Sequence, residues 1–367
     1  MTATARPLLR PLRMGEILDR AIHLYRRHFL HFVGVVALVQ VPLVLAQMSV
    51  SVLAFGGTLA RMDEMLSNPA AVPESPLAVF GPSYLAGASL NTLVSILGFI
   101  LVQGVATAAL TAAVTRSYLG APAPNIVDAY RAIKDRWVAV VGALLLAVLL
   151  GLALAAWWIL VPCVGWLTGG GMLLFLWQVI VPLLAPIVIL EEISPASAWR
   201  RAWSLTRRRF WWVLGFALLL YLFNLLVVAG PAAVVTAAGQ FAFGQPFDFD
   251  QGTFTIQTVV QSLTTLITSL LYLPLQVAAM TLLYIDLRVR TEGLDLAILT
   301  RQVQPQVEPV AAVSQLPTAS GEPALITGKE WRNFAVITVG VIVTITVLYL
   351  LLVGLVVALL AAFGAGV

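Results

Sequence analysis

Seven long apolar segments dominate this sequence and constrain its fold more than any other feature. They lie at about 30–55, 86–115, 137–161, 172–190, 210–238, 256–285 and 333–363. As a helix, each segment is long enough to cross ~30 Å of hydrocarbon. Only helices and closed barrels satisfy their backbone hydrogen bonds in lipid, and these segments lack the alternation of barrel strands. The sequence therefore predicts an all-α integral membrane protein with seven transmembrane helices.

The composition agrees with a membrane protein and argues against other classes. Hydrophobic residues make up 60% of the chain and charged residues only 10%, whereas charged residues approach a quarter of a soluble domain. The basic residues flank the apolar segments, which is the orientation signal of membrane proteins and not the pattern of a nucleic-acid-binding surface. We expect no nucleic-acid partner. The strong excess of arginine over lysine is typical of a GC-rich bacterial genome, so we expect a bacterial inner-membrane protein.

The distribution of basic residues predicts the orientation. All Lys and Arg residues except Arg61 lie in the ends and loops at 1–29, 116–136, 191–209, 286–301 and 329–332. Basic loops stay in the cytoplasm. The N-terminus is therefore predicted to be cytoplasmic and, after seven crossings, the C-terminus outside.

A basic and aromatic stretch precedes the first, third and fifth apolar segments with the same internal spacing. Counted back from a glycine, an aromatic residue lies five positions earlier, a basic residue eight earlier and an alanine thirteen earlier. The matched sets are Gly34, Phe29, Arg26 and Ala21; Gly142, Trp137, Lys134 and Ala129; and Gly215, Phe210, Arg207 and Ala202. This spacing predicts three repeats, each an interfacial helix followed by a transmembrane hairpin. Alternatively, unrelated interfacial segments have converged on arginine and aromatic residues.

The three predicted interfacial helices cover about 14–28, 126–137 and 196–210. Apolar residues spaced three and four apart predict that each helix lies in the headgroup plane, with its arginines toward anionic lipid. Asn125 and Ser194 are plausible N-caps for the second and third helices. The candidate contacts for lipid or a membrane partner are Arg26, Arg27, Lys134, Arg136, Trp199, Trp203, Arg207, Arg208 and Arg209.

Three parts follow from these patterns: a six-helix membrane domain over 1–300, a flexible cytoplasmic linker over 301–330 and a C-terminal transmembrane helix over 331–367. The linker is rich in proline, nearly uncharged and without periodicity, as expected for a flexible segment. In the last helix, Gly354, Ala358 and Ala362 are four residues apart, which could form a close packing seam.

Few side chains point to chemistry. The three histidines, His23, His28 and His31, lack metal-ligand spacing, and Cys163 has no basic partner that would form a thiolate. Glu191 and Glu192 are expected to pair with the arginines of the third interfacial helix. Two pairs of residues four apart, Asp286 with Arg290 and Arg288 with Glu292, are expected to form structural ion pairs. We therefore expect no catalytic residue, no metal site and no cofactor.

Polar residues inside the apolar segments leave two readings open. They include Gln40, Gln103, Gln178, Asn224 and Gln276, and prolines lie in several of the same segments. Polar groups in lipid usually face protein or a cavity, and broken helices line many transport sites. These residues either line a cavity of a transporter or channel or form hydrogen bonds between helices.

Three stretches together resemble a known family. They are PLRMGEILDRAIHLYRRHF at 11–29, AWRRAWSLTRRRF at 198–210 and LYIDLRVRTEGLDL at 283–296, and they are similar to motifs of the glycerophosphoryl diester phosphodiesterase membrane-domain family. The resemblance implies a six-helix membrane module over roughly 8–300. The soluble catalytic barrel fused to it in other members has no counterpart here. We therefore expect a non-enzymatic accessory or scaffold protein, and the alternative is a transporter or channel for a small solute or lipid.

Overall fold

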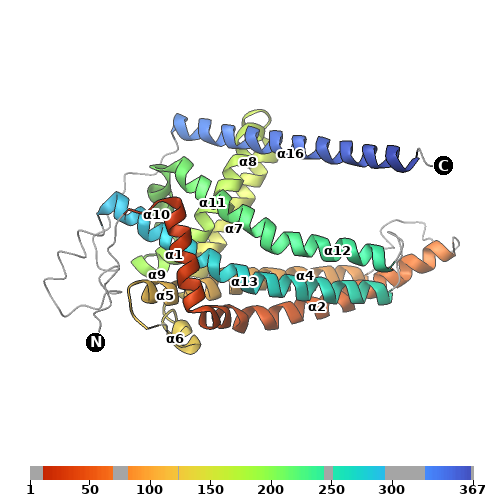
Figure 1. Ribbon diagram of the computed structural model, residues 1–367, viewed down its shortest axis with the longest axis horizontal. Helices are drawn as coiled ribbons and strands as arrows, with labels where there is room; N and C mark the ends of the chain where they lie inside the picture. Colours follow the sequence, from red (N-terminus) through yellow and green to blue (C-terminus); the bar gives the residue numbers. More distant parts are fainter. Residues whose placement is uncertain (1–10, 69–81, 123, 244–250, 294–326, 365–367) are drawn as a thin grey trace.

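A computed structural model describes residues 11–68, 82–122, 124–243, 251–293 and 327–364, and these residues form helices and short connections with no strand (Figure 1). The linker predicted at 301–330 lies almost entirely outside the described residues. The elements are α1 (Met14–Arg27), α2 (Phe29–Ser67), α4 (Pro82–Phe99), η2 (Ile100–Ala106), α5 (Thr107–Tyr118), α6 (Ile126–Arg131), α7 (Trp137–Leu160), α8 (Val164–Phe175), η3 (Leu176–Ile180), α9 (Val181–Glu191), α10 (Pro195–Arg207), α11 (Phe210–Asn224), η4 (Leu225–Ala229), α12 (Gly230–Phe243), α13 (Gln251–Glu292) and α16 (Gly328–Gly364), where η marks a π-helical segment.

Within the described residues, seven helical stretches are long and apolar enough to cross a membrane. Three of them contain a π-helical segment: α4–η2–α5, α8–η3–α9 and α11–η4–α12. The prediction of an all-α, multi-pass membrane protein is therefore confirmed. Two boundaries differ from expectation. The helix α2 continues past 55 to Ser67, and the segment expected from 172 begins with α8 at Val164, so glycines 169–171 lie inside a helix.

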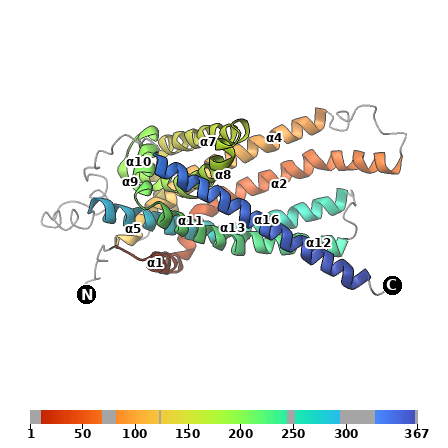
Figure 2. The ribbon, with the colours of Figure 1, turned by 90° about the horizontal axis from the view of Figure 1, so that it is seen from above.

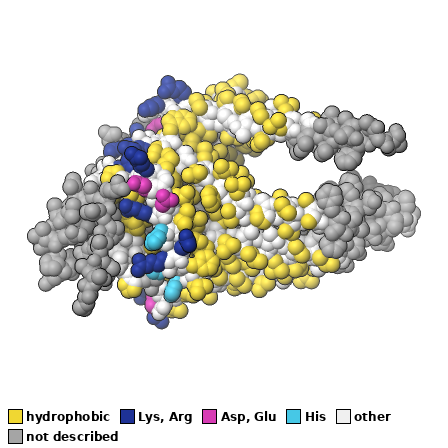
Figure 3. All heavy atoms as spheres, in the orientation of Figure 1, with side chains coloured by type: hydrophobic (Ala, Val, Ile, Leu, Met, Phe, Trp, Pro, Cys, Tyr) yellow, Lys and Arg dark blue, Asp and Glu magenta, His cyan; other side chains and the backbone are white. Residues whose placement is uncertain are grey.

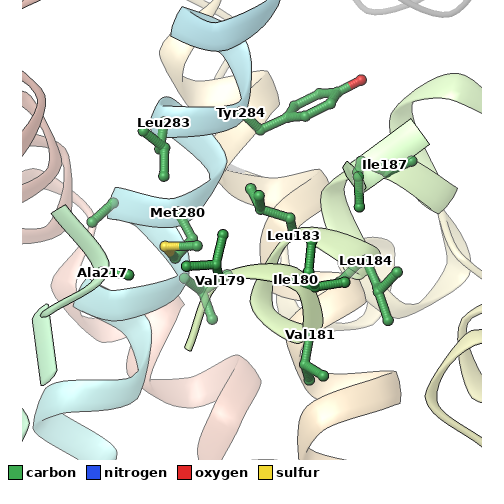
Figure 4. Packing of buried hydrophobic residues seen from close by; sticks show 14 of the residues in the cluster. Val179, Ile180, Val181, Leu183, Leu184, Ile187, Ala217, Met280, Leu283 and Tyr284 are labelled. Atoms are coloured by element: carbon green, nitrogen blue, oxygen red, sulfur yellow. The ribbon is translucent and has the colours of Figure 1, made fainter. Parts of the chain in front are cut away.

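Three helices form the centre of the bundle, since α5, α9 and α13 each contact the other two. Figure 4 shows part of this packing, in which Leu183 of α9 lies on the side toward α13, the helix that carries Met280 and Leu283. Residue after residue of α9 is buried, so this helix is a continuous apolar run without a polar face. In lipid such packing is stabilised by close van der Waals contact rather than by removal of apolar surface from water.

The short helices α1, α6 and α10 each begin on a glycine of a long helix. A Cβ built on Gly34 of α2 would lie 2.7 Å from Cδ1 of Ile126, the first residue of α6. The corresponding first residues are Pro195 of α10, 3.1 Å from a Cβ on Gly142, and Met14 of α1, 3.7 Å from a Cβ on Gly215. The absence of a side chain thus lets a short helix approach closely at Gly34 and Gly142, whereas a Cβ on Gly215 would make an ordinary van der Waals contact.

Hydrogen bonds reinforce two of these contacts at the residue that follows the glycine. The Tyr130 hydroxyl donates to the carbonyl of Val35 at 2.6 Å, and the Trp199 indole N–H donates to the carbonyl of Ala143 at 3.0 Å. Burial raises the pKa of Tyr130 to about 12, so the phenol remains a neutral donor. Both aromatic side chains therefore anchor a short helix to the first turns of a long one.

The ends of the short helices match the sequence expectation in part. Ser194 caps α10 by accepting a hydrogen bond from the backbone N–H of Ser197, with Pro195 at the first helical position. Asn125 precedes α6 but its side chain makes no capping hydrogen bond. The helix expected over 126–137 stops at Arg131, and hydrogen-bonded turns connect it to α7.

The last helix, α16, packs against α8 and leaves the rest of its length largely uncovered. Figure 2 shows α16 crossing over the bundle, and in Figure 1 its C-terminal half runs apart from α12. Apolar side chains from Val339 to Val353 are mostly exposed. Charged side chains gather at the end of the molecule where α16 begins, beside a mainly hydrophobic surface (Figure 3). We call this the charged end.

Candidate functional site

A buried cluster of four charged side chains joins α9, α10 and α13 at the charged end. Arg201 Nε lies 2.8 Å from Glu191 Oε2, and its Nη2 contacts Glu292. Arg288 Nε lies 3.0 Å from Glu292 Oε2 and 3.7 Å from Glu191 Oε1. The Tyr284 hydroxyl donates to Glu191 Oε1 at 2.7 Å. Two guanidiniums and two carboxylates therefore balance one another.

The local backbone explains how neighbouring glutamates take opposite roles. Glu192 adopts a left-handed conformation with φ of 55° and ψ of 35°, which ends α9 and turns the chain toward α10. Glu191 then stays inside, whereas Glu192 is exposed and its carboxylate lies 2.7 Å from Arg136 Nη2. The expectation that these glutamates pair with arginines of the third interfacial helix is confirmed for Glu191, whose partner is Arg201. It is wrong for Glu192, whose partner Arg136 belongs to the second stretch.

A second charged pair holds the segment that leads into α1. Asp286 accepts the backbone N–H of Leu12 at 2.7 Å, and Arg290 donates to the carbonyl oxygen of the same residue. Arg290 Nε also lies 2.7 Å from Asp286 Oδ2. The two ion pairs expected at spacing four, Asp286 with Arg290 and Arg288 with Glu292, are both confirmed. Each of these two ion pairs also contacts a residue that is distant in the sequence.

The triple glycine of α8 is the docking site of α16. A Cβ on Gly171 would overlap the carbonyl oxygen of Phe334, and the Gly171 N–H donates to Thr338 Oγ1 at 2.7 Å. Nearby, Glu330 lies 3.3 Å from Arg207 Nε. By contrast, a Cβ on Gly354 would meet no described atom within 4 Å, so the packing seam considered there has no partner at that residue.

The nine predicted lipid- or partner-contacting residues divide into two groups. Five basic side chains are exposed and form no ion pair with a described residue: Arg26, Arg27, Lys134, Arg208 and Arg209. The other four contact protein. Arg136 pairs with Glu192 and Arg207 with Glu330, while Trp199 and Trp203 are half-buried against the bundle.

Trp199 and Trp203 also line an apolar cavity of about 280 Å³. Its wall combines residues of α7, α8, η3, α10 and α16, including Phe175 and Phe334, and Arg200 lies at its border. Phe334 of α16 packs edge-on against Phe175, with ring centres 5.9 Å apart. The cavity is therefore bounded by the aromatic contacts that dock α16.

The intramembrane polar residues are not brought together. Gln40 donates to Ser269 Oγ at 2.7 Å, between α2 and α13. Gln103 and Gln178 lie within η2 and η3, and Asn224 immediately precedes η4. Gln276 is half-buried on α13. These five residues line none of the three cavities described in this structure.

The π-helical segments accompany sequence features that disturb regular helix. Pro182 and Pro186 follow η3, and Pro231 follows η4. Proline removes a backbone donor and clashes with the preceding turn, which favours a local widening of the helix. η2 contains Gly104 instead of a following proline. Polar residues at π-helical segments are common at functional sites, but here they come from three separate helices.

Sequence reasoning missed Arg201 as a site residue, although a signal for it exists. Arg201 lies on the same helical face as Ala198, Ala202 and Leu205, all of which are buried. A charged residue on an apolar face requires a buried partner. The spacing of α10 could therefore have identified Arg201, but not Glu191 as the partner.

The described residues contain no group of three or more His, Cys, Asp or Glu side chains placed to hold a metal ion. Cys163 is exposed and lies between α7 and α8. Comparison of the chain with protein-family models, curated proteins and solved structures found no match. The resemblance to the glycerophosphoryl diester phosphodiesterase membrane-domain family stays a prediction from the three quoted stretches, and the chain is shown to be a multi-pass, all-α membrane protein.

Proposed function

We propose that this chain is a non-enzymatic accessory or scaffold protein of a bacterial inner membrane, whose charged end contacts anionic lipid or a membrane partner. One contrast carries the proposal. The buried charges of the cluster around Glu191 are paired internally, whereas Arg26, Arg27, Lys134, Arg208 and Arg209 are exposed without a described carboxylate partner. Exposed basic groups beside apolar helices suit anionic headgroups. For this role the protein is oriented with its charged end and N-terminus in the cytoplasm and its C-terminus outside.

The architecture that we propose for this role is a ring of three repeats with α16 added. Its support is the cyclic order of the glycine contacts. The short helix of the second copy begins on Gly34 of the first, that of the third on Gly142 of the second, and that of the first on Gly215 of the third. This order supports the proposal that the three basic stretches form a collar for lipid or a partner around one end of the bundle.

The test replaces charges that the bundle itself does not use. In Arg208→Gln/Arg209→Gln, the ion pair between Arg207 and Glu330 stays in place. We expect the double variant, extracted gently and studied by native mass spectrometry, to lose co-purifying anionic lipid or a specific protein companion. Arg61→Gln is the control, because it removes a positive charge from the predicted opposite side. Unchanged lipid and protein profiles in the double variant would count against the proposal.

A second candidate function, transport of a small polar solute, has one observation in its favour. A cavity of about 380 Å³ lies between α2, α12 and α13, and polar side chains including Thr236, Gln257 and Gln261 contribute to its lining. Thr236 donates to Gln261 Oε1 at 2.8 Å. Polar groups that line a cavity within transmembrane helices mark many substrate pathways.

Whether water fills this cavity distinguishes a transport function from the scaffold function. In a Cys163→Ser background, Gln257→Cys in a water-filled cavity should react with a membrane-impermeant maleimide. Leu226→Cys, at an exposed apolar position of η4, is the lipid-facing control. Equal protection of both cysteines would exclude an open aqueous path and leave the scaffold function.

A further inference from the structure

A groove of about 860 Å³ separates α1 from the turn that follows α5. Arg20, His23 and Arg27 line one wall. These residues are three and four positions apart, so they form one stripe along α1. Ser117 and Tyr118 line the opposite wall. The groove thus combines the guanidiniums of Arg20 and Arg27 with two hydroxyl groups.

The two walls are held at a fixed distance by one hydrogen bond. Arg20 Nη1 donates to the Tyr118 hydroxyl at 2.9 Å. This bond orients the guanidinium across the groove, and the phenol keeps its own O–H to donate elsewhere. Ser117 Oγ has no hydrogen-bond partner among the described residues. Ser117 Oγ is buried, however, so the Tyr118 O–H is the donor available on that wall.

The positive charge of the groove is not neutralised by ion pairs with the surrounding protein. Asp19 is the one carboxylate among the lining residues, against the guanidiniums of Arg20 and Arg27. None of these lining charges forms an ion pair with another described residue. The carbonyls that end α5 do not require them either, because backbone N–H groups of the following turn already donate to Arg116 and Ser117.

We propose that this groove binds a phosphate-bearing anion, with Arg20 and Arg27 as its charged contacts and the hydroxyl group of Tyr118 as a further donor. Guanidinium groups match phosphate oxygens in geometry and bind them through charge-assisted hydrogen bonds. Two sources supply that chemistry: the headgroup of an anionic lipid and a soluble phosphorylated compound. Leu30, at the start of α2, is 79% exposed, so lipid-facing surface begins close to the groove.

This inference deepens the proposed lipid contact of the charged end and rests on it for the lipid source. The two can fail separately, because Arg208 and Arg209 lie at the end of α10 and do not line the groove. Loss of lipid in the α10 variant with normal binding in the groove, or the reverse, would distinguish them.

The experiment uses the full chain in nanodiscs of zwitterionic lipid. One arm titrates sodium pyrophosphate and follows binding by thermophoresis. The other arm includes dioleoylphosphatidic acid in the nanodisc and counts bound lipid by native mass spectrometry. For Arg20→Gln/Arg27→Gln we expect binding in at least one arm to weaken by about tenfold or more, since charge-assisted hydrogen bonds contribute more than about 1.4 kcal/mol, which is a factor of ten. The affected arm identifies the source.

Two further variants keep the test decisive. Arg131→Gln removes an exposed charge of α6 that does not line the groove, and it should bind like the wild type. Arg27→Gln alone retains the hydrogen bond between Arg20 and Tyr118. This single variant therefore still tests anion binding in the groove if the double variant fails to fold. Wild-type binding in both arms by the folded groove variants would overturn the proposal. An equal loss in Arg131→Gln would also overturn it, because the effect would then come from general surface charge.

Discussion

The carboxylate of Asp286 accepts a hydrogen bond from the backbone N–H of Leu12 at 2.7 Å, although 274 positions separate the two residues. Arg290 completes the contact by donating to the carbonyl oxygen of Leu12. Leu12, which lies two positions before the start of α1, is thus held at its backbone N–H and its carbonyl by two side chains near the end of α13. This contact joins the beginning of the described chain to its sixth membrane-spanning stretch.

Asp286→Ala should destabilise the protein strongly. It leaves the Leu12 N–H without its acceptor and the half-buried Arg290 without its carboxylate. Removal of one partner of a buried ion pair costs about 3–5 kcal/mol. Thermal unfolding in detergent measures the loss, and hydrogen exchange at Leu12 localises it. Asp135→Ala, at an exposed carboxylate of the loop before α7, should change neither. Equal stabilities of the two variants would refute the contact.

Replacing both partners of the ion pair between Glu191 and Arg201 should destabilise the cluster less than replacing one partner alone. Arg201→Leu leaves Glu191, whose side chain is 1% exposed, without its closest guanidinium, and should cost about 3–5 kcal/mol. Glu191→Leu/Arg201→Leu keeps Arg288 paired with Glu292 and should recover most of this loss. Denaturation of both single variants and the double variant gives the coupling. Additive losses would show that the pair contributes no interaction energy.

Gly171→Ala should detach α16 from α8. The added Cβ would overlap the backbone carbonyl of Phe334, which cannot move aside as a flexible side chain can. The measurement is disulfide crosslinking between cysteines placed at Gly170 and Thr338, because a Cβ built on Gly170 would lie 3.3 Å from Cγ2 of Thr338. Gly340→Ala is the control, since a Cβ there meets nothing within 4 Å. Undiminished crosslinking in Gly171→Ala would contradict the close packing.

His28 should make stability depend on pH. Burial, together with the charge of Arg27, lowers the pKa of His28 below its usual 6.5. The unfolded chain therefore takes up this proton first as the pH falls through 6.5, and the free energy of unfolding decreases until the folded pKa is reached. His28→Gln should flatten the curve in this window. Unfolding midpoints of the wild type and His28→Gln, measured from about pH 7.5 to about pH 5, test this expectation. Parallel curves would show that groups other than His28 cause the pH dependence.

Local sequence was sufficient wherever the partners lie within a few residues. The ion pairs of Asp286 with Arg290 and of Arg288 with Glu292 follow from helical spacing. The cap of α10 by Ser194 follows from its position before a proline. The expected start of the fourth segment at 172 is wrong, because glycines 169–171 continue the helix α8 and allow α16 to approach it.

The sequence by itself determined that the chain spans a membrane as helices, because apolar length and backbone hydrogen bonding leave few alternatives in lipid. Only the tertiary structure decided which charges are used internally. Arg201 and Arg288 meet Glu191 from different helices, and Leu12 meets Asp286 across almost the whole chain. Such partners depend on how helices pack, and the packing surface in this bundle consists of many interchangeable apolar side chains that specify no pairing on their own.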